Sequence, residues 1–318
     1  MQKPMSPSSS RLQPQTKKQT AGSAGRNEGT RKQANEESRK QASNESRKQA
    51  LRPIGVFDSG VGGLTVAAAL RDLLPAENIF YIGDTARVPY GGKSQQTIER
   101  YSVEITGLLL AENAKMIVVA CNSASALAIP RLEEILKVPV IGVIVPGAKA
   151  AITASRKGRV GVIGTRATIY SRAYERAIQA LNPDVEVISQ ACPMLVPLIE
   201  EGWLDDPITD QVIKRYLGKL VKEDIDTLVL GCTHYPLLKA ALKKFAGPEI
   251  TLVDSARNCA IAVKELLKKE KIAAPAHHIG KLQVALTDKS DGFLRIAEQA
   301  LSLQIGDVQL RTVQTVQG

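Results

Sequence analysis

The sequence predicts an α/β protein whose mostly parallel sheets are flanked by helices. Three observations support this class: short runs rich in Val and Ile recur between residues 53 and 231, helical patterns separate most of them, and several runs end in small polar residues. Near-continuous apolar strands that alternate with helices are typical of parallel sheets covered on both faces.

The expected elements have recognisable starts and ends. The strand PIGVFD at 53–58 leads through SGVGG into the helical pattern LTVAAALRDLL, which Pro75 stops. A longer helical pattern covers residues 96–113. The other expected strands are 79–84, 115–120, 138–144, 159–164, 184–189 and 226–231.

The excess positive charge belongs mainly to the N-terminal segment. Residues 1–50 hold 11 of the 42 Lys and Arg residues and 4 of the 32 Asp and Glu residues, so they carry +7 of the net charge of +10. The segment is nearly free of aliphatic residues and repeats RKQANEES, RKQASNES and RKQA from positions 31, 39 and 47. We expect a disordered, basic, low-complexity tail over 1–50, with a transient charged helix as the alternative.

The sequence shows neither a membrane helix nor a signal peptide, and this predicts where in the cell the protein is found. No apolar run approaches the roughly 18 residues of a membrane helix, and the N-terminus has no apolar signal-peptide core, so we expect a cytoplasmic protein. Cys121, Cys192, Cys232 and Cys259 lie far apart without a CxxC pair, which argues against a disulfide framework or a zinc knuckle.

Two segments of the chain follow a similar plan. IGVFDSG and VGVIGTR each open a series of strands, and MIVVACNSASA and TLVLGCTHYPL each place a cysteine after an apolar strand. The economical interpretation is two α/β units of similar plan after the tail, each presenting one cysteine. Coincidence between common strand and turn patterns is the alternative.

Reactive side chains gather at the ends of the expected strands. Parallel sheets bind ligands beyond the carboxyl ends of their strands. The residues at such ends are Asp58, Asp84, Cys121, Thr165 and Cys232. The neighbouring loops DSGVGG, CNSAS and GTRAT open helices, whose N-termini favour carboxylate or phosphate and lower the pKa of nearby thiols.

Nucleotide and metal sites are disfavoured by spacing. GGKS at 91–94 ends like a P-loop, but Arg87 stands where its first glycine is required, and Thr65 replaces the last glycine of GxGxxG. Cys232 and His234, two residues apart, match no usual zinc spacing. We therefore expect no metal.

The cysteines divide into two kinds. For Cys192 and Cys259 we expect inert core thiols. Cys121 and Cys232 both follow an apolar strand and precede polar side chains, so they are candidates for an acid/base pair. Inversion of a stereocentre needs one group to remove a proton and another to deliver one to the opposite face. No motif identifies a pyridoxal lysine, so we expect no cofactor.

These residues resemble the family of cofactor-independent aspartate/glutamate racemases. The resemblance covers residues 53 to about 300 and leaves out the tail. Its segments are PIGVFDSGVGGLTV, YIGDTARVPYGGKS, VVACNSASA, GVIGTRATI, PLIEEGW, LVLGCTHYPLL and LVDSA. It implies two similar lobes with the active site in the cleft between them: residues 51–145 completed by 255–318, and residues 146–254.

The resemblance also implies a reaction and its residues. Glutamate would be racemized without a cofactor, supplying D-glutamate for peptidoglycan synthesis. Cys121 would take the α-proton of D-glutamate with help from Asp58, and Cys232 that of L-glutamate with help from His234 and Glu200. The expected substrate-binding residues are Asp58, Ser59, Tyr90, Gly91, Asn122, Ser123, Thr165, Thr233 and His234.

Several alternatives stay open at the level of sequence. Asp58 could be a helix cap alone, Glu201 could replace Glu200, and His234 could only orient Cys232. Two departures from the family pattern, Ser123 in place of the usual Thr and Ala167 in the GTRAT turn, affect the fit of the substrate.

The function and the partners also have alternatives. Another thiol-dependent racemase, such as an aspartate racemase, is the near alternative, and a nucleic-acid-binding protein acting through its basic tail is the distant one. As partners we expect glutamate, no membrane, and no nucleic acid for the folded body. Homodimerisation is left open, and the sequence does not indicate a partner for the tail.

Overall fold

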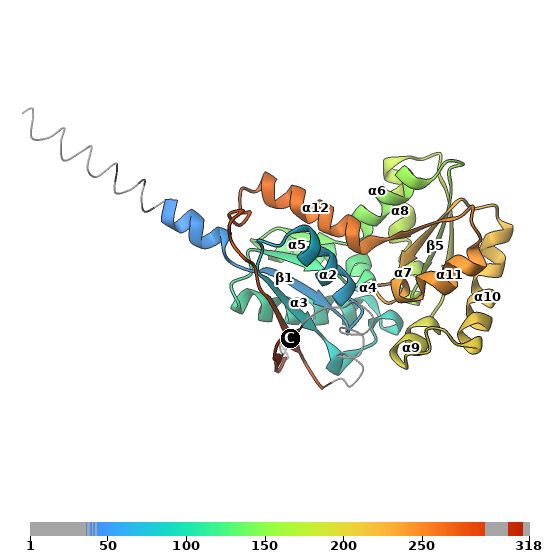
Figure 1. Ribbon diagram of the computed structural model, residues 1–318, viewed down its shortest axis with the longest axis horizontal. Helices are drawn as coiled ribbons and strands as arrows, with labels where there is room; N and C mark the ends of the chain where they lie inside the picture. The colour runs from blue at the N-terminus through green and yellow to red at the C-terminus, as the bar shows by residue number, and fades with distance from the viewer. Residues whose placement is uncertain (1–35, 37–38, 40, 42, 290–304, 314–318) are drawn as a thin grey trace, which may run out of the picture. The chain divides into compact units, whose positions relative to one another are not determined.

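Two parallel sheets form the framework of the protein (Figure 1). The computed structural model describes residues 36, 39, 41, 43–289 and 305–313. The chain divides into units 1–46 and 47–318, and the sheets lie in the second. In the described part, every pair of neighbouring strands runs parallel. The predicted α/β class is confirmed.

The strand order of the second sheet repeats that of the first. The first sheet has the order β10-β9-β2-β1-β3-β4 and the second β6-β5-β7-β8, so β5 to β8 follow the arrangement of β1 to β4. The strands of the first sheet are β1 (Ile54–Asp58), β2 (Ile79–Gly83), β3 (Met116–Val119), β4 (Val140–Gly142), β9 (Leu282–Leu286) and β10 (Val308–Leu310). Those of the second are β5 (Arg159–Gly164), β6 (Glu186–Ala191), β7 (Thr227–Gly231) and β8 (Thr251–Asp254). Cys121 follows β3 and Cys232 follows β7, so the two cysteines occupy equivalent places.

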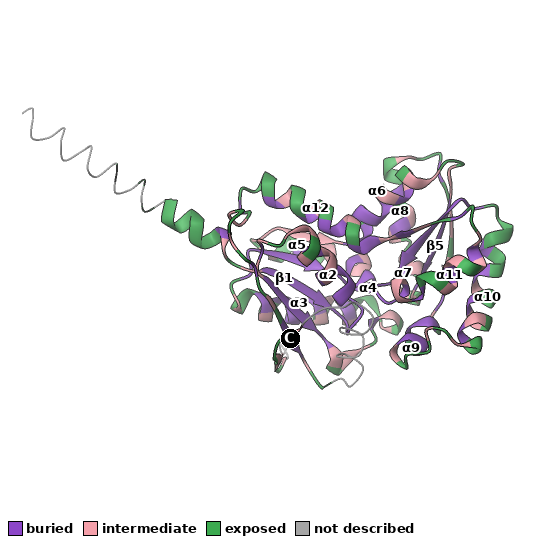
Figure 2. Ribbon diagram, viewed as in Figure 1, coloured by how far each residue is buried: buried purple, intermediate pink, exposed green. Residues whose placement is uncertain are grey.

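Helices cover both faces of each sheet, and the alternation of strand side chains explains how (Figure 2). In β1, Val56 packs with α2 and α12, while its neighbour Phe57 packs with α3, α4 and α5. In β7, Val229 packs with α6 and α8, while Leu228 packs with α9, α10 and α11. The α-helices are α2 (Leu64–Leu73), α3 (Gln95–Ala111), α4 (Asn122–Leu127), α5 (Ile129–Ile135), α6 (Ile144–Ala154), α7 (Arg166–Tyr170), α8 (Ala173–Leu181), α9 (Leu195–Glu200), α10 (Pro207–Lys222), α11 (Lys239–Ala246) and α12 (Ser255–Lys269). Short 3₁₀ turns lie at η1 (Thr85–Arg87), η2 (Tyr90–Gly92) and η3 (Tyr235–Leu238).

A buried ion pair and its hydrogen bonds join four segments at the base of the first sheet. Lys115, just before β3, places its Nζ 2.5 Å from Glu77 Oε2 and also donates to the carbonyls of Ala50 and Ile272, at 2.5 and 2.8 Å. The second oxygen of Glu77 accepts from the backbone N–H of Ala274 at 2.7 Å. Both charges are therefore satisfied without solvent.

The elements differ from the sequence expectations in a few places. Residues 43–50 are helical, so the disorder expected through residue 50 does not extend over its last residues, where Arg, Lys, Gln and Ala favour helix. The rest of the expected tail lies outside the described residues or is described only at isolated positions. Ile144 begins α6 instead of ending a strand, and β8, β9 and β10 were not among the expected strands. In the described ranges, no helix is long and apolar enough to span a membrane.

Candidate active site

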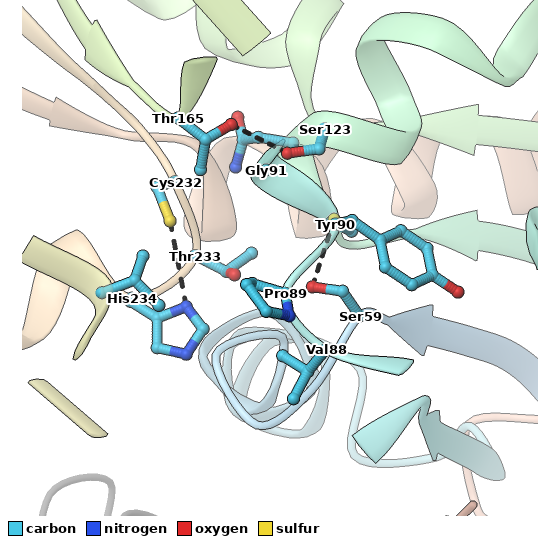
Figure 3. A pocket seen from close by; sticks show the side chains of 13 residues that line it. Ser59, Val88, Pro89, Tyr90, Gly91, Ser123, Thr165, Cys232, Thr233 and His234 are labelled. Carbon is cyan, nitrogen blue, oxygen red and sulfur yellow. Dashed lines mark hydrogen bonds between the residues drawn. The ribbon is translucent and has the colours of Figure 1, made fainter. Parts of the chain in front are cut away.

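The turns that follow β1, β3, β5 and β7 meet around one cavity (Figure 3). Both sheets contribute to its wall, as expected for the carboxyl ends of parallel strands. The cavity has a volume of about 20 Å³, which is room for about one water molecule. Its lining residues are Ser59, Val88, Pro89, Tyr90, Gly91, Cys121, Asn122, Ser123, Thr165, Val196, Cys232, Thr233 and His234.

The cavity wall has two halves: the first is formed by the turns that follow strands of the first sheet, and the second by the turns that follow strands of the second sheet. Cys121 stands at the N-terminus of α4, in the first half. Its side chain is buried, and its sulfur lies 3.6 Å from the Ser59 hydroxyl. Burial, and next the negative charge of Asp58, raise the pKa of the Cys121 thiol to about 12, although hydrogen bonds from Ala124 and Ser59 act in the opposite direction. Cys121 is therefore a neutral thiol at neutral pH.

Cys232 faces His234 in the second half of the cavity. The Cys232 sulfur lies 3.8 Å from His234 Nδ1, and His234 Nε2 lies 3.3 Å from Glu200 Oε1. Burial lowers the pKa of His234, but hydrogen bonds to Cys232 and Glu200 and the charges of Cys232 and Asp58 outweigh burial and raise that pKa to about 10. At neutral pH an imidazolium thus stands beside the Cys232 sulfur.

Asp58 is fully buried and connects the two halves of the cavity wall. Its Oδ2 accepts from the backbone N–H of Gly60 at 3.1 Å, and its Oδ1 accepts from the Thr233 hydroxyl at 3.3 Å. Burial raises the pKa of Asp58, while His234 and these hydrogen bonds oppose the rise. Because α2 begins at Leu64 with Gly63 as its N-cap, Asp58 is not the cap of that helix.

Two further contacts cross from one half of the wall to the other. The hydroxyls of Ser123 and Thr165 lie 2.9 Å apart, and the Tyr174 hydroxyl donates to Asn122 Oδ1 at 2.8 Å. Thr165 also accepts from the backbone N–H of Thr168, as the N-cap of α7. These contacts hold the polar side chains of Asn122, Ser123 and Thr165 in place at the cavity.

Tyr90 and Gly91 line the cavity, but the Tyr90 hydroxyl does not point into it, and Gly91 is packed tightly against Thr165. The Tyr90 ring is buried, and its hydroxyl donates to Asp84 Oδ2, so it points away from Cys232 (Figure 3). Asp84 also receives Arg87 Nε at 2.7 Å, and Arg87 pairs with the buried Glu104. This network fixes η2, and Gly91 lies so close to Thr165 that a Cβ on it would be 2.6 Å from the Thr165 Cβ.

The other predicted site residues fall in two groups. Ser59, Thr233 and His234 line the cavity, whereas Asp58 and Glu200 support lining residues from behind them. Cys192 and Cys259 are buried in the cores outside the lining, as is typical of inert thiols. Val88, Pro89 and Val196 were missed, because an apolar side chain carries no chemical signal in a sequence.

The structure also bears on Glu200, Glu201 and metal binding. Glu200 reaches His234, while Glu201 is exposed. Among the described residues, no group of three or more His, Cys, Asp or Glu side chains is arranged to hold a metal ion.

Comparison with known proteins identifies the class to which this fold and site belong. The family model for Asp/Glu/Hydantoin racemase matches residues 64–264. Glutamate racemases from Geobacter metallireducens and Syntrophus aciditrophicus are 49% and 51% identical, each over 81% of this chain and over 95% and 96% of their own lengths. The chain therefore belongs to the Asp/Glu racemase family.

Within that family, the solved structures that match this chain include glutamate racemases, like the relatives just named. The glutamate racemase from Bacillus anthracis matches with a TM-score of 0.79 and 44% identity, over 82% of this chain and 97% of that one. The glutamate racemase from Francisella tularensis, solved in complex with D-glutamate, matches with a TM-score of 0.78 and 36% identity, over 84% of this chain and 100% of that one.

Proposed function

We propose that this protein interconverts L- and D-glutamate by direct proton transfer at Cα, with Cys121 and Cys232 as the two acid/base groups. The observation that carries the proposal is the placement of two thiols at equivalent strand ends of two sheets, both lining one cavity. Stereoinversion needs two such groups, because the proton leaves from one face and arrives on the other.

The direction of the reaction decides which thiol acts as the base. In the direction from L- to D-glutamate, the thiolate of Cys232 takes the α-proton, and the Cys121 thiol gives its own proton to the opposite face of the carbanion. The reaction leaves a Cys232 thiol and a Cys121 thiolate. This state is ready for the reverse direction, and loss of the Cys232 proton to water with gain of a proton from water by Cys121 restores the first state for another L-to-D turnover. Imidazolium at His234 stabilises the negative charge on Cys232, and Cys121 with a pKa of about 12 begins as the acid.

The supporting residues hold these states and the substrate. Glu200 keeps His234 in place and charged, and Asp58 assists Cys121 when that residue acts as the base. Asn122 and the Ser123–Thr165 hydroxyl pair, with the backbone at Ser59 and Gly91, offer hydrogen-bond donors to the substrate carboxylates, while the Thr233 hydroxyl donates to Asp58. Fixed donors at the site of developing charge are what a cofactor-free carbanion requires.

The cellular role we propose is the supply of D-glutamate for peptidoglycan. The glutamate named in the relatives makes it the first substrate to test. All four cysteines are free, which suits a reducing compartment such as the cytoplasm.

Reaction in deuterated water tests the mechanism. A two-base racemase places solvent deuterium in the first product formed, while the recovered substrate stays unlabelled. Each enantiomer of glutamate is followed by NMR and chiral chromatography, with aspartate run in parallel. Equal early labelling of substrate and product would show a single base and overturn the proposal that the two cysteines act as a pair. Faster turnover of aspartate than of glutamate would overturn the proposal that glutamate is the substrate.

A further inference from the structure

Tyr174 is a buried side chain that the proposed mechanism leaves without a role. It is the second residue of α8 and is only 2% exposed. Glycines stand where side chains would collide with its ring: a Cβ on Gly147 or on Gly231 would lie 3.1 Å from a ring carbon. The ring therefore occupies a fitted slot between α6 and the end of β7, which sets the direction of its hydroxyl.

That hydroxyl reaches from the second sheet's helices to the first half of the cavity wall. It donates a hydrogen bond of 2.8 Å to Asn122 Oδ1, in α4 directly after Cys121. The side chain of Ser255, at the start of α12, opposes the rise that burial causes in the pKa of Tyr174. Because the amide oxygen of Asn122 can only accept, the phenolic proton is directed to Asn122.

The Asn122 amide is left with its donors free. Asn122 lines the cavity and is 2% exposed, and within the described part of the chain its Nδ2 has no hydrogen-bond partner. A buried N–H group without a partner is costly, so such a group at a binding site is complementary to an acceptor that the ligand brings. Substrate carboxylate oxygens are acceptors of that kind.

We infer that Tyr174 is a positioning residue that fixes the Asn122 amide with its N–H donors toward a carboxylate of the substrate. Rotation of the amide by half a turn would break the bond to the hydroxyl and present a carbonyl oxygen to that carboxylate. The inference rests on the proposed function for the identity of the substrate. It adds a residue that does not touch the reacting atoms. By holding the Asn122 amide in one orientation, Tyr174 makes the site beside Cys121 favour a negatively charged carboxylate of the substrate.

Removal of the single hydroxyl tests the inference. In Tyr174→Phe the ring keeps its slot while Asn122 loses its orientation, so we expect kcat/KM to fall about 10- to 100-fold, mostly through a higher KM. Tyr170→Phe is the matched control, because Tyr170 is 73% exposed. In an Asn122→Ala background the Tyr174→Phe change should have almost no further effect. Unchanged kinetics, or effects that simply add, would overturn the inference.

Binding measured without turnover separates this inference from the thiol mechanism. In a background that carries Cys121→Ala and Cys232→Ala, so that D-glutamate is not turned over, we expect calorimetry to show weaker binding by Asn122→Asp than by Asn122→Ala, because the aspartate presents a negative oxygen to the carboxylate while keeping its bond to Tyr174. Binding by Asn122→Asp that equals or exceeds that of Asn122→Ala would mean that an ammonium lies there, and would overturn the inference. This comparison holds whether or not the cysteines transfer the proton, and it remains available if Tyr174→Phe fails to fold.

Discussion

The Thr233 hydroxyl donates a hydrogen bond of 3.3 Å to the Asp58 carboxylate, joining the turn after β7 to the turn after β1. Thr233 lies between Cys232 and His234, and the charge of Asp58 acts on both Cys121 and His234. One carboxylate thus influences the acid/base groups on both sides of the cavity. Its own protonation is held in balance by burial, which favours the neutral acid, and by Thr233 and His234, which favour the charge.

Thr233→Val should move the acid limb of the pH profile upward. Without the hydroxyl, Asp58 loses one of the bonds that oppose the rise of its pKa, so the carboxylate form appears only at higher pH. We expect the acid limb of kcat/KM to shift by about 1 pH unit. Thr233→Ser keeps the hydroxyl and should retain the original profile. An unshifted limb in the valine variant would separate Asp58 from the rate-limiting proton transfer.

The four cysteines should differ sharply in their effect on racemization. Cys121→Ala and Cys232→Ala each remove one member of the proton-transfer pair, so we expect losses of at least about 10²- to 10⁴-fold in kcat. Cys192→Ala and Cys259→Ala should leave kcat close to the original, since neither thiol lines the cavity. Chiral chromatography of folded, reduced variants provides the measurement. A Cys121 or Cys232 variant with near-normal activity would remove that thiol from the mechanism.

The positions of Asp58, Cys121 and Cys232 at the ends of strands could be predicted from the sequence, because each strand shows as an apolar run that stops at small polar residues. Asp58, Cys121 and Cys232 stand where an apolar run meets small polar residues, and the structure places them around one cavity or against its wall. The sequence could not choose between Glu200 and Glu201, since that choice depends on the last turn of α9. Tyr174 was missed because its partner Asn122 lies 52 residues away and an aromatic residue in an amphipathic helix is usually core. The direction of the Tyr90 ring depends on Asp84 and Arg87, whose pairing no local pattern reveals.

Protonation of His234 should make stability depend on pH. Its pKa is about 10 in the folded protein, against about 6.5 for an unfolded histidine, so the folded state holds the proton more tightly. This contribution to stability is fully present below about pH 6.5 and is lost as pH rises through about 10. Urea unfolding of the original protein and of His234→Asn at about pH 6 and about pH 9.5 should give free-energy differences that shrink at the higher pH. A difference that does not change with pH would contradict the raised pKa.

Lys115 should matter for stability and not for chemistry. Lys115→Met leaves Glu77 charged and buried without its partner, so we expect the free energy of unfolding to fall by roughly 3–5 kcal/mol. The matched control is Lys157→Met, which breaks the exposed pair with Asp224 and should cost less than about 1 kcal/mol. Chemical denaturation measures both, with kcat at low temperature unchanged in each. Equal costs for the two variants would contradict the structural role of the buried pair.

Two adjacent glycines, Gly91 and Gly92, test whether close packing of η2 against the turn after β5 is needed for activity. Gly91 faces Thr165 across the cavity, where a new Cβ would lie 2.6 Å from the Thr165 Cβ, whereas a Cβ on Gly92 meets no atom within 4 Å. Neither glycine has a positive φ, so alanine adds no backbone strain at either position. Gly91→Ala should therefore push η2 and the turn after β5 apart.

The displacement also affects the bond between Ser123 and Thr165, which lie 2.9 Å apart. Because a cavity of about 20 Å³ has room for about one water molecule, we expect the wall to open to admit substrate and to close again around it. A wall that cannot close misplaces the donors, and a misplacement of about 1 Å costs about 10²-fold in rate. We expect that loss in kcat/KM for Gly91→Ala and a change below about twofold for Gly92→Ala, with circular dichroism checking that both variants are folded. If both variants were equally active, the close approach of Gly91 to Thr165 would have no part in catalysis.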